Sequence, residues 1–197
     1  MMIENVVADT SFYLCYYNDI RKNECLNIFL GSYSFYLGSK ILGELPKSLA
    51  KSDSFLSVVN FNDESFFELV KPFFGRSTNH EKDGEYEAIG LAYHLNLHFG
   101  LKYLIIDDRR AYNFVAVNFK SLEHKLTRNI GFIVKSYKED SILSLKMTIE
   151  ILESIQLCVQ KAITEGSTSR PCSADPKVCR KILIPLIKEL KDEYECR

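Results

Sequence analysis

The feature that most limits the possible folds is a pair of short hydrophobic runs that each end in aspartate. Residues 6–8, "VVA", come directly before Asp9, and residues 103–106, "YLII", come directly before Asp107 and Asp108. Runs of this length and composition are typical of buried strands. Helical patterns separate them, and strands separated by helices pair in parallel. The sequence therefore predicts an α/β fold, a three-layer α/β/α sandwich with a central, mainly parallel sheet of four to five strands.

The other elements follow from hydrophobic periodicity and from caps and breakers. We expect strands at residues 4–9, 32–38 and 102–107. We expect helices at residues 11–20, 24–31, 39–50, 84–100, 108–119 and 141–164. Residues 130–137 fit a strand or a helix, and residues 52–80 fit a strand then a helix, or two helices.

The tail differs in composition from the rest of the chain. Residues 1–164 form the predicted main domain, residues 165–176 a linker rich in Ser and Pro, and residues 177–197 an amphipathic C-terminal helix that extends the fold. No stretch approaches the ~18 apolar residues of a membrane span, and the N-terminus lacks the pattern of a signal peptide. We therefore expect a cytoplasmic protein with no membrane contact, whose six cysteines stay thiols. A zinc site in the tail stays open, although its cysteines are widely spaced.

Several carboxylates are predicted at one edge of the sheet. Asp9, Asp107 and Asp108 follow strands, and the carboxyl ends of parallel strands meet where such folds bind ligands. Helical phase puts Glu85 at the edge of an apolar face and Glu87 on its flank. That face comprises Ala88, Leu91, Ala92, Leu95 and Phe99. Glu44 lies within one turn of an apolar residue in residues 39–50, so it too can approach the sheet.

Each acid also has a purely structural explanation. Aspartate at a strand-to-helix junction is a good N-cap, and acids in a first helical turn interact favourably with the helix dipole. Their combination is harder to explain, because carboxylates that converge in a low-dielectric crevice repel one another unless a cation neutralises them. Ligands that are all oxygen favour Mg²⁺ or Mn²⁺ over zinc.

Charge is unevenly distributed, although the net charge is only −1. Residues 52–87 hold eight acids and three bases, whereas residues 109–138 hold seven bases and one acid. An acidic block beside a basic one suits a metal cluster next to a face that attracts phosphate, although both blocks also fit solvated helix faces.

Four motifs together resemble those of PIN-domain nucleases. They are "VVADTSFYL", Glu44 in "GEL", "GEYEAIGLA" and "LIIDDRRA", and the likeness covers residues 5–155. PIN-domain proteins that carry motifs of this kind are similar to the toxins of type II toxin-antitoxin pairs. The resemblance implies an α/β/α fold, a Mg²⁺ or Mn²⁺ site, single-stranded RNA as substrate, frequent homodimers and, in some members, an antitoxin that covers the site. Residues 45–80 and 160–197 depart from the pattern.

The resemblance assigns the site residue by residue. Asp9, Glu44, Glu85 and Asp108 match the four catalytic acids, and the implied metal ligands are Asp9, Glu85, Asp107 and Asp108. Thr10 or Ser11 matches a supporting hydroxyl, and Glu87 is an outer ligand or a salt-bridge partner. The resemblance implies the activity of an endoribonuclease, a hydrolase in which a metal ion lowers the pKa of the attacking water. The bases expected to draw in the RNA backbone are Arg109, Arg110, Lys120, Lys125 and Arg128.

Two other functions stay open. The first is a catalytically silent PIN-like module that binds RNA or protein, although such a module has no reason to keep four mutually repelling acids. The second is an enzyme with an aspartyl nucleophile, but "DTSF" has no second Asp two residues on.

Overall fold

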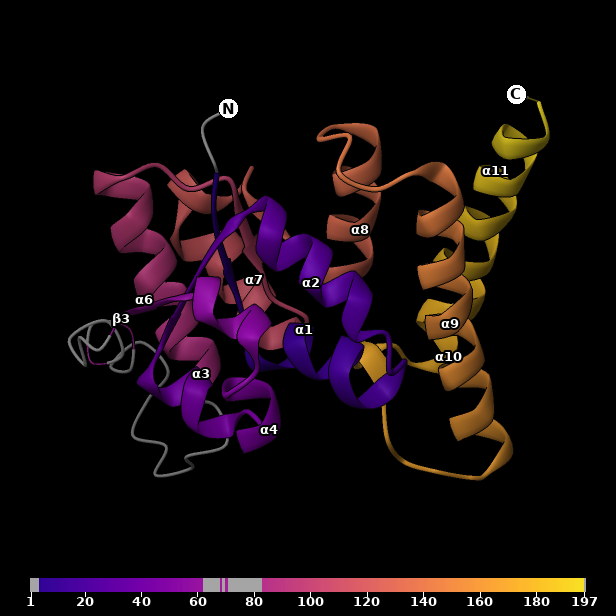
Figure 1. Ribbon diagram of the computed structural model, residues 1–197, viewed down its shortest axis with the longest axis horizontal. Coiled ribbons are helices and arrows are strands. Elements are labelled where there is room, and N and C mark those ends of the chain that lie inside the picture. The colour runs from indigo at the N-terminus through magenta and orange to yellow at the C-terminus, as the bar shows by residue number, and fades with distance from the viewer. Residues whose placement is uncertain (1–3, 62–67, 69, 71–82, 197) are drawn as a thin grey trace.

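The computed structural model describes residues 4–61, 68, 70 and 83–196, and in these residues five strands form one parallel sheet (Figure 1). The strands are β1 (Asn5–Ala8), β2 (Ser34–Gly38), β3 (Val59–Phe61), β4 (Tyr103–Ile105) and β5 (Leu126–Thr127), in the order β3-β2-β1-β4-β5. β1 is the central strand, since Val6 pairs with Phe35 of β2 on one side and with Tyr103 of β4 on the other. All four pairings are parallel, as the sequence predicts.

Helices cover both faces of the sheet and confirm the three-layer α/β/α sandwich (Figure 1). One layer contains α1 (Thr10–Leu14), α2 (Asn23–Ser32) and α8 (Asn129–Lys138). The other contains α6 (Asp83–His98) and α7 (Arg109–Asn118), with α3 (Ser39–Glu44) packed against α6 and followed by α4 (Lys47–Ala50). The last helix of the predicted main domain is α9 (Leu145–Thr164). The C-terminal extension adds α10 (Pro176–Val178) and α11 (Ile184–Glu195), and α9 and α11 pack together outside α8.

Short helical turns complete the described chain. They are η1 (Cys15–Asp19), η2 (Asp53–Ser57), η5 (Lys120–Leu122), η6 (Pro171–Ser173) and η7 (Cys179–Leu183). Residues 130–137, ambiguous in the sequence, belong to helix α8, where Phe132, Ile133 and Ser136 are buried at helical spacing. In the ambiguous stretch 52–80, β3 supports the strand-then-helix alternative. Residues 62–67, 69 and 71–82, which hold three of the eight acids and all three bases of the stretch 52–87, lie outside the described residues.

An aromatic cluster fixes how β1 leads into α1. The Phe12 ring contacts the rings of Tyr16, Phe29, Phe35 and Phe132 at centroid distances of 5.2, 6.1, 5.3 and 5.6 Å. All five side chains are fully or almost fully buried. Because rings of this size dominate core energetics, the cluster holds the first turn of α1 against the sheet. Asp9, at the junction of β1 and α1, is therefore placed by the core.

The phase of α6 is largely as predicted. Ala88, Leu91, Ala92 and Leu95 are fully buried. Phe99 is an exception, because it follows the last helical residue and is 64% exposed. The chain turns at Gly100, whose φ of 78° lies in the left-handed region that glycine adopts without strain.

The cysteines differ from expectation at one pair. Cys15, in η1, and Cys172, in the predicted linker, form a disulfide, so the expectation that all the cysteines stay thiols is wrong for these two. A zinc site that uses the Cys172 thiolate is excluded in this state, because a bridged sulfur is not a thiolate ligand. Cys25, Cys158, Cys179 and Cys196 are free. Divisions at residues 164 and 176 stay predictions, but the bridge joins the segment between them to the main domain.

None of the described helices combines the length and the apolar character needed to cross a bilayer.

Candidate active site

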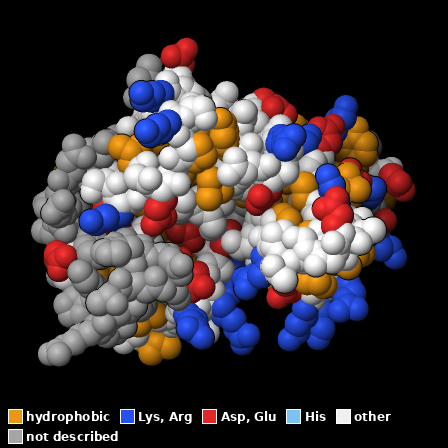
Figure 2. All heavy atoms as spheres, turned by 90° about the horizontal axis from the view of Figure 1, so that it is seen from below, with side chains coloured by type: hydrophobic (Ala, Val, Ile, Leu, Met, Phe, Trp, Pro, Cys, Tyr) orange, Lys and Arg blue, Asp and Glu red, His pale blue; other side chains and the backbone are white. Residues whose placement is uncertain are grey.

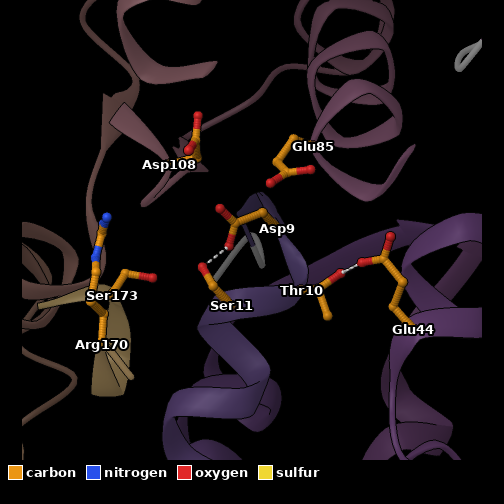
Figure 3. Close-up of a pocket in the computed structure, with 8 residues that line it drawn as sticks. All are labelled: Asp9, Thr10, Ser11, Glu44, Glu85, Asp108, Arg170 and Ser173. Atoms are coloured by element: carbon orange, nitrogen blue, oxygen red, sulfur yellow. Dashed lines mark hydrogen bonds between the residues drawn. The ribbon is translucent and has the colours of Figure 1, made fainter. Parts of the chain in front are cut away.

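Four carboxylates from four separate chain segments line one pocket of about 270 Å³ at the carboxyl edge of the sheet (Figure 3). Asp9 follows β1, Glu44 ends α3, Glu85 lies in the first turn of α6, and Asp108 comes just before α7. The other lining residues are Thr10, Ser11, Arg170 and Ser173. The structure thus brings together the four acids that the sequence singles out as catalytic.

Asp9 is held by hydrogen bonds on both oxygens. Its Oδ1 accepts from the Phe12 N–H at 3.2 Å and from the Ser11 hydroxyl, which makes it the N-cap of α1. Its Oδ2 accepts from the Asp107 N–H at 2.9 Å, which ties the end of β1 to the end of β4. Burial raises the pKa of Asp9, and these hydrogen bonds oppose that rise. Asp9 is therefore both a structural cap and a fixed carboxylate of the pocket.

Glu44 is oriented by the first residues of α1 and α6. Its Oε1 accepts from the Gly84 N–H at 3.1 Å, and its Oε2 accepts from the Thr10 hydroxyl. A Cβ added at Gly84 would lie 2.6 Å from Glu44 Oε2 and 2.9 Å from Thr10 Oγ1, so a larger residue here would displace these two side chains. The glycine of "GE" at the start of α6 thus leaves room for Glu44 to keep its bonds to Gly84 and Thr10.

Asp108 and Glu85 face each other across the pocket in Figure 3. Asp108 is the N-cap of α7, because its Oδ1 accepts from the Arg110 and Ala111 N–H groups at 2.9 and 2.8 Å. Glu85 is partly buried, and burial, followed by the charges of Asp9, Glu44 and Asp108, raises its pKa to about 7. Like charges in a desolvated pocket cause such a rise, and perturbed carboxyl groups of this kind concentrate at functional sites.

We expect the raised pKa of Glu85 to make stability depend on pH in the presence of chelator. A carboxyl with pKa about 7 when folded and 4.5 when unfolded binds more protons in the folded state between these values. The free energy of unfolding therefore falls as pH rises from about 4.5 to about 7, by roughly 1–2 kcal/mol after screening by solvent. Glu85→Gln should be more stable than wild type at pH 8 and equal to it at pH 4. Denaturant titrations check this, and an equal difference at both pH values would contradict it.

Asp107 is not part of this pocket, although the resemblance implies that it is a metal ligand. It is buried, and its Oδ1 accepts from the Asn129 N–H at 3.0 Å at the start of α8. Its Oδ2 is buried and has no hydrogen-bond partner in the described part of the chain. Burial and the charge of Asp9 raise its pKa to about 7. Asp107 lines a separate cavity of about 630 Å³ between α8 and the C-terminal extension.

Glu87 also faces away from the pocket and caps another helix. Its Oε1 accepts from the Lys40 N–H at 3.0 Å and its Oε2 from the Ile41 N–H at 2.9 Å, at the start of α3. The side chain is buried against Gly38, where an added Cβ would lie 2.2 Å from the carboxyl carbon. These contacts give Glu87 a structural role as the cap of α3. Neither of the two roles predicted for it, outer metal ligand or salt-bridge partner, would require these contacts.

We expect Glu87→Ala to lower the free energy of unfolding by about 2–3 kcal/mol, because it leaves one buried and one partly buried N–H group of α3 without this acceptor. Glu87→Gln keeps one acceptor oxygen and should lose less than half of that. Urea denaturation measures both variants. A Glu87→Ala protein as stable as wild type but unable to bind Mn²⁺ would instead show that Glu87 is a ligand.

The five predicted RNA-binding bases are divided between the two ends of the sheet. Arg109 and Arg110 are exposed at the start of α7, directly after Asp108. Arg128 follows the carboxyl end of β5, and its guanidinium lies over the Tyr112 ring at 5.0 Å. Lys120 and Lys125 come before β5, at the opposite edge, where they contact Glu123 and Asn96. In Figure 2, red acidic side chains gather in a central hollow and blue basic side chains lie next to it.

Two residues that line the pocket, Arg170 and Ser173, were not predicted from the sequence. They fall in the segment predicted to be a linker, which has no hydrophobic periodicity to place it against the fold. The only signal was the neighbouring cysteine, Cys172, and a sequence does not reveal which cysteines pair.

Comparison with known proteins does not add a family to this geometry. The chain matches no protein-family model, no curated protein and no solved structure. The resemblance to PIN-domain nucleases therefore stays an interpretation of the four acidic motifs and the site they form.

Proposed function

We propose that the protein is a metal-dependent nuclease of the PIN type that hydrolyses phosphodiester bonds of single-stranded RNA. The observation that carries this proposal is the convergence of Asp9, Glu44, Glu85 and Asp108 on one pocket at the carboxyl edge of a parallel sheet. In folds of this class that edge is where ligands bind. Four acids from four chain segments also need a counter-charge, which a divalent cation supplies.

The donor set fits a hard cation. All four acids present oxygen, and the pKa of Glu85 is raised by its burial first and then by the charges of the other three. As the side chains stand, no three described His, Cys, Asp or Glu residues are close enough together to hold one metal ion. Carboxylates repel one another when no cation lies between them. The spacing of the four acids therefore agrees with what is expected of a cation site. Asp9, Glu85 and Asp108 would hold Mg²⁺ or Mn²⁺, with Glu44 in reach.

The chain's own groups prepare the site for phosphodiester hydrolysis. A bound cation would supply Lewis acidity and a water of lowered pKa. Asp9 is fixed by hydrogen bonds from Ser11, Phe12 and Asp107, so its carboxylate would offer a cation an oxygen in a set position. Arg109 and Arg110 lie beside Asp108 and offset the negative charge that the RNA backbone brings to an acidic pocket.

The same site also indicates what the proposed enzyme binds. Single-stranded RNA is the proposed substrate. The phosphate contacts are assigned to Arg109, Arg110 and Arg128, which follow strands at the carboxyl edge of the sheet, rather than to Lys120 and Lys125. A homodimer and an antitoxin protein stay predictions that rest on the resemblance alone.

The test is incubation of purified protein with a mixed pool of single-stranded RNA and DNA, in Mg²⁺, in Mn²⁺ and in chelator. Cleavage of RNA that needs metal and stops with chelator is the expected result. Cleavage of DNA and not of RNA would show that the proposed substrate is wrong. No cleavage in any metal, with no cation bound by calorimetry, would overturn the proposal and favour a silent binding module.

A further inference from the structure

Residues 170–173, here called the C-terminal clasp, contribute the only positive charge among the described residues that line the acidic pocket. Figure 3 shows Arg170 and Ser173 on the opposite side of Asp9 from Glu44. They come from the segment after α9, far in sequence from every acid of the site. The pocket therefore has an acidic wall built by the main domain and a second wall supplied by the tail.

Two links, one covalent and one polar, attach the clasp to η1, which continues the helix that Asp9 caps. Cys172 is bonded to Cys15, and the Cys172 N–H donates to Asp19 Oδ2 at 2.6 Å. Cys15 and Asp19 are the ends of η1, which continues α1 without a break. Cys172 and Ser173 have φ values of 48° and 55°, in the left-handed region that non-glycine residues adopt only when their surroundings impose it. The shape of the clasp thus depends on these links.

The Arg170 guanidinium is available to a ligand. The residue is exposed, and within the described part of the chain its guanidinium makes neither a hydrogen bond nor an ion pair, although four carboxylates line the same pocket. A guanidinium presents N–H groups in a planar fork that matches two oxygens of a phosphate. The Ser173 hydroxyl lines the same wall and can donate to a third oxygen.

We propose that Arg170, with Ser173, binds a phosphate of the RNA backbone opposite the four acids, and that the Cys15–Cys172 disulfide holds it there. This inference rests on the proposed function and adds the anion-binding wall to its site. The acids alone would repel an RNA strand, and a fixed cation on the facing wall counters that repulsion. Reduction by a small dithiol breaks the Sγ–Sγ bond, gives two protein thiols and oxidises the dithiol to its own disulfide. The freed clasp then presents Arg170 less well, and RNA affinity falls.

Binding of a labelled single-stranded RNA, followed by fluorescence anisotropy, tests the role of Arg170. Ca²⁺ replaces Mg²⁺ in this assay because it has the same charge and ligand preference but a looser geometry. Arg170→Ala should weaken binding about tenfold or more and reduce the salt dependence by about one phosphate contact, and Arg170→Lys should restore part of the affinity. The matched control is Lys177→Ala, which removes an exposed charge outside the pocket and should change affinity less than twofold. Equal effects of Arg170→Ala and Lys177→Ala would overturn the inference.

The role of the disulfide is tested with the same assay. Dithiol treatment, or Cys15→Ser with Cys172→Ser, should weaken RNA binding about as much as Arg170→Ala, while circular dichroism shows that the protein remains folded. In the protein without the disulfide, Arg170→Ala should then weaken RNA binding by less than a further twofold. Asp19→Asn loosens the clasp with the bridge intact and should give a smaller loss. A full tenfold effect of Arg170→Ala without the bridge would overturn the positioning role.

Wild-type cleavage in Mg²⁺ separates the two proposals. A wild-type enzyme that cleaves RNA, with Arg170→Ala binding RNA as tightly as wild type, overturns only the anion-binding wall. A wild-type protein that neither binds nor cleaves RNA overturns the proposed function, and the wall with it.

Discussion

Asp9→Asn is expected to reduce metal-dependent RNA cleavage by about 10³-fold or more, while the protein stays folded. Asparagine is as good an N-cap as aspartate, so the Phe12 N–H keeps an acceptor and α1 keeps its start. The substitution removes a negative charge from the cation site, and it replaces Oδ2 with an amide group that cannot accept from the Asp107 N–H. The loss of charge should therefore dominate activity, because stabilisation of developing charge contributes most to catalysis of such reactions. Initial rates in Mg²⁺ and in Mn²⁺ measure it.

A matched control separates charge from capping. Asp175 is also an N-cap, since its Oδ1 accepts from the Val178 N–H at 2.8 Å, but it does not line the pocket. Asp175→Asn makes the same chemical change and should leave the rate within twofold of wild type. The nuclease assignment of Asp9 would be refuted by an Asp9→Asn protein that cleaves RNA at the wild-type rate and melts at the wild-type temperature.

Removal of the Cys15–Cys172 disulfide is expected to cost about 5 kcal/mol of stability, the loop-entropy value for residues 157 positions apart. Domains are stable by about 5–15 kcal/mol in total, so the reduced protein should lie near its unfolding threshold at elevated temperature. For a chain of this size the melting temperature should fall by roughly 10–20 °C. Thermal melts of wild type, with and without a dithiol, and of the double serine variant measure the change.

The control for this experiment is Cys196→Ser, because Cys196 is an exposed, free thiol. It should melt within about 1 °C of wild type, as surface substitutions usually do. A dithiol that lowers the melting temperature of wild type and of the double serine variant equally would show that the shift does not come from this bridge.

The sequence was sufficient to predict the sheet and the acidic edge because their signals are local. "VVA" and "YLII" have the composition of buried strands, and an aspartate after each one falls at the carboxyl edge of a parallel sheet. The helical phase of residues 84–100 was enough to direct Glu85 toward that edge and to separate it from Glu87. β5 was missed because its two residues are too few to show any periodicity.

Features that depend on which distant residue a side chain contacts could not be predicted from local sequence signals. Neighbouring acids Asp107 and Asp108 look equivalent in the sequence, yet Asp107 bonds the start of α8 and Asp108 faces the pocket. Likewise, nothing local in the stretch around Cys172 shows that it meets Cys15, because that contact is decided by tertiary packing between residues 157 positions apart.

The central place of β1 in the sheet has a consequence for the newly made chain. Val6 and Val7 pair with Tyr103 and Leu104, so the strand that leads to Asp9 is synthesised long before one of its two neighbours, and Asp108 comes later still. At about 5–20 residues per second, roughly 5–20 s separate the synthesis of Asp9 from that of Asp108. Until then the ribosome carries a chain whose central strand lacks one neighbour and whose pocket lacks its fourth acid. An enzyme that cuts RNA would thus become competent only after its own message has been read past the codon for Asp108.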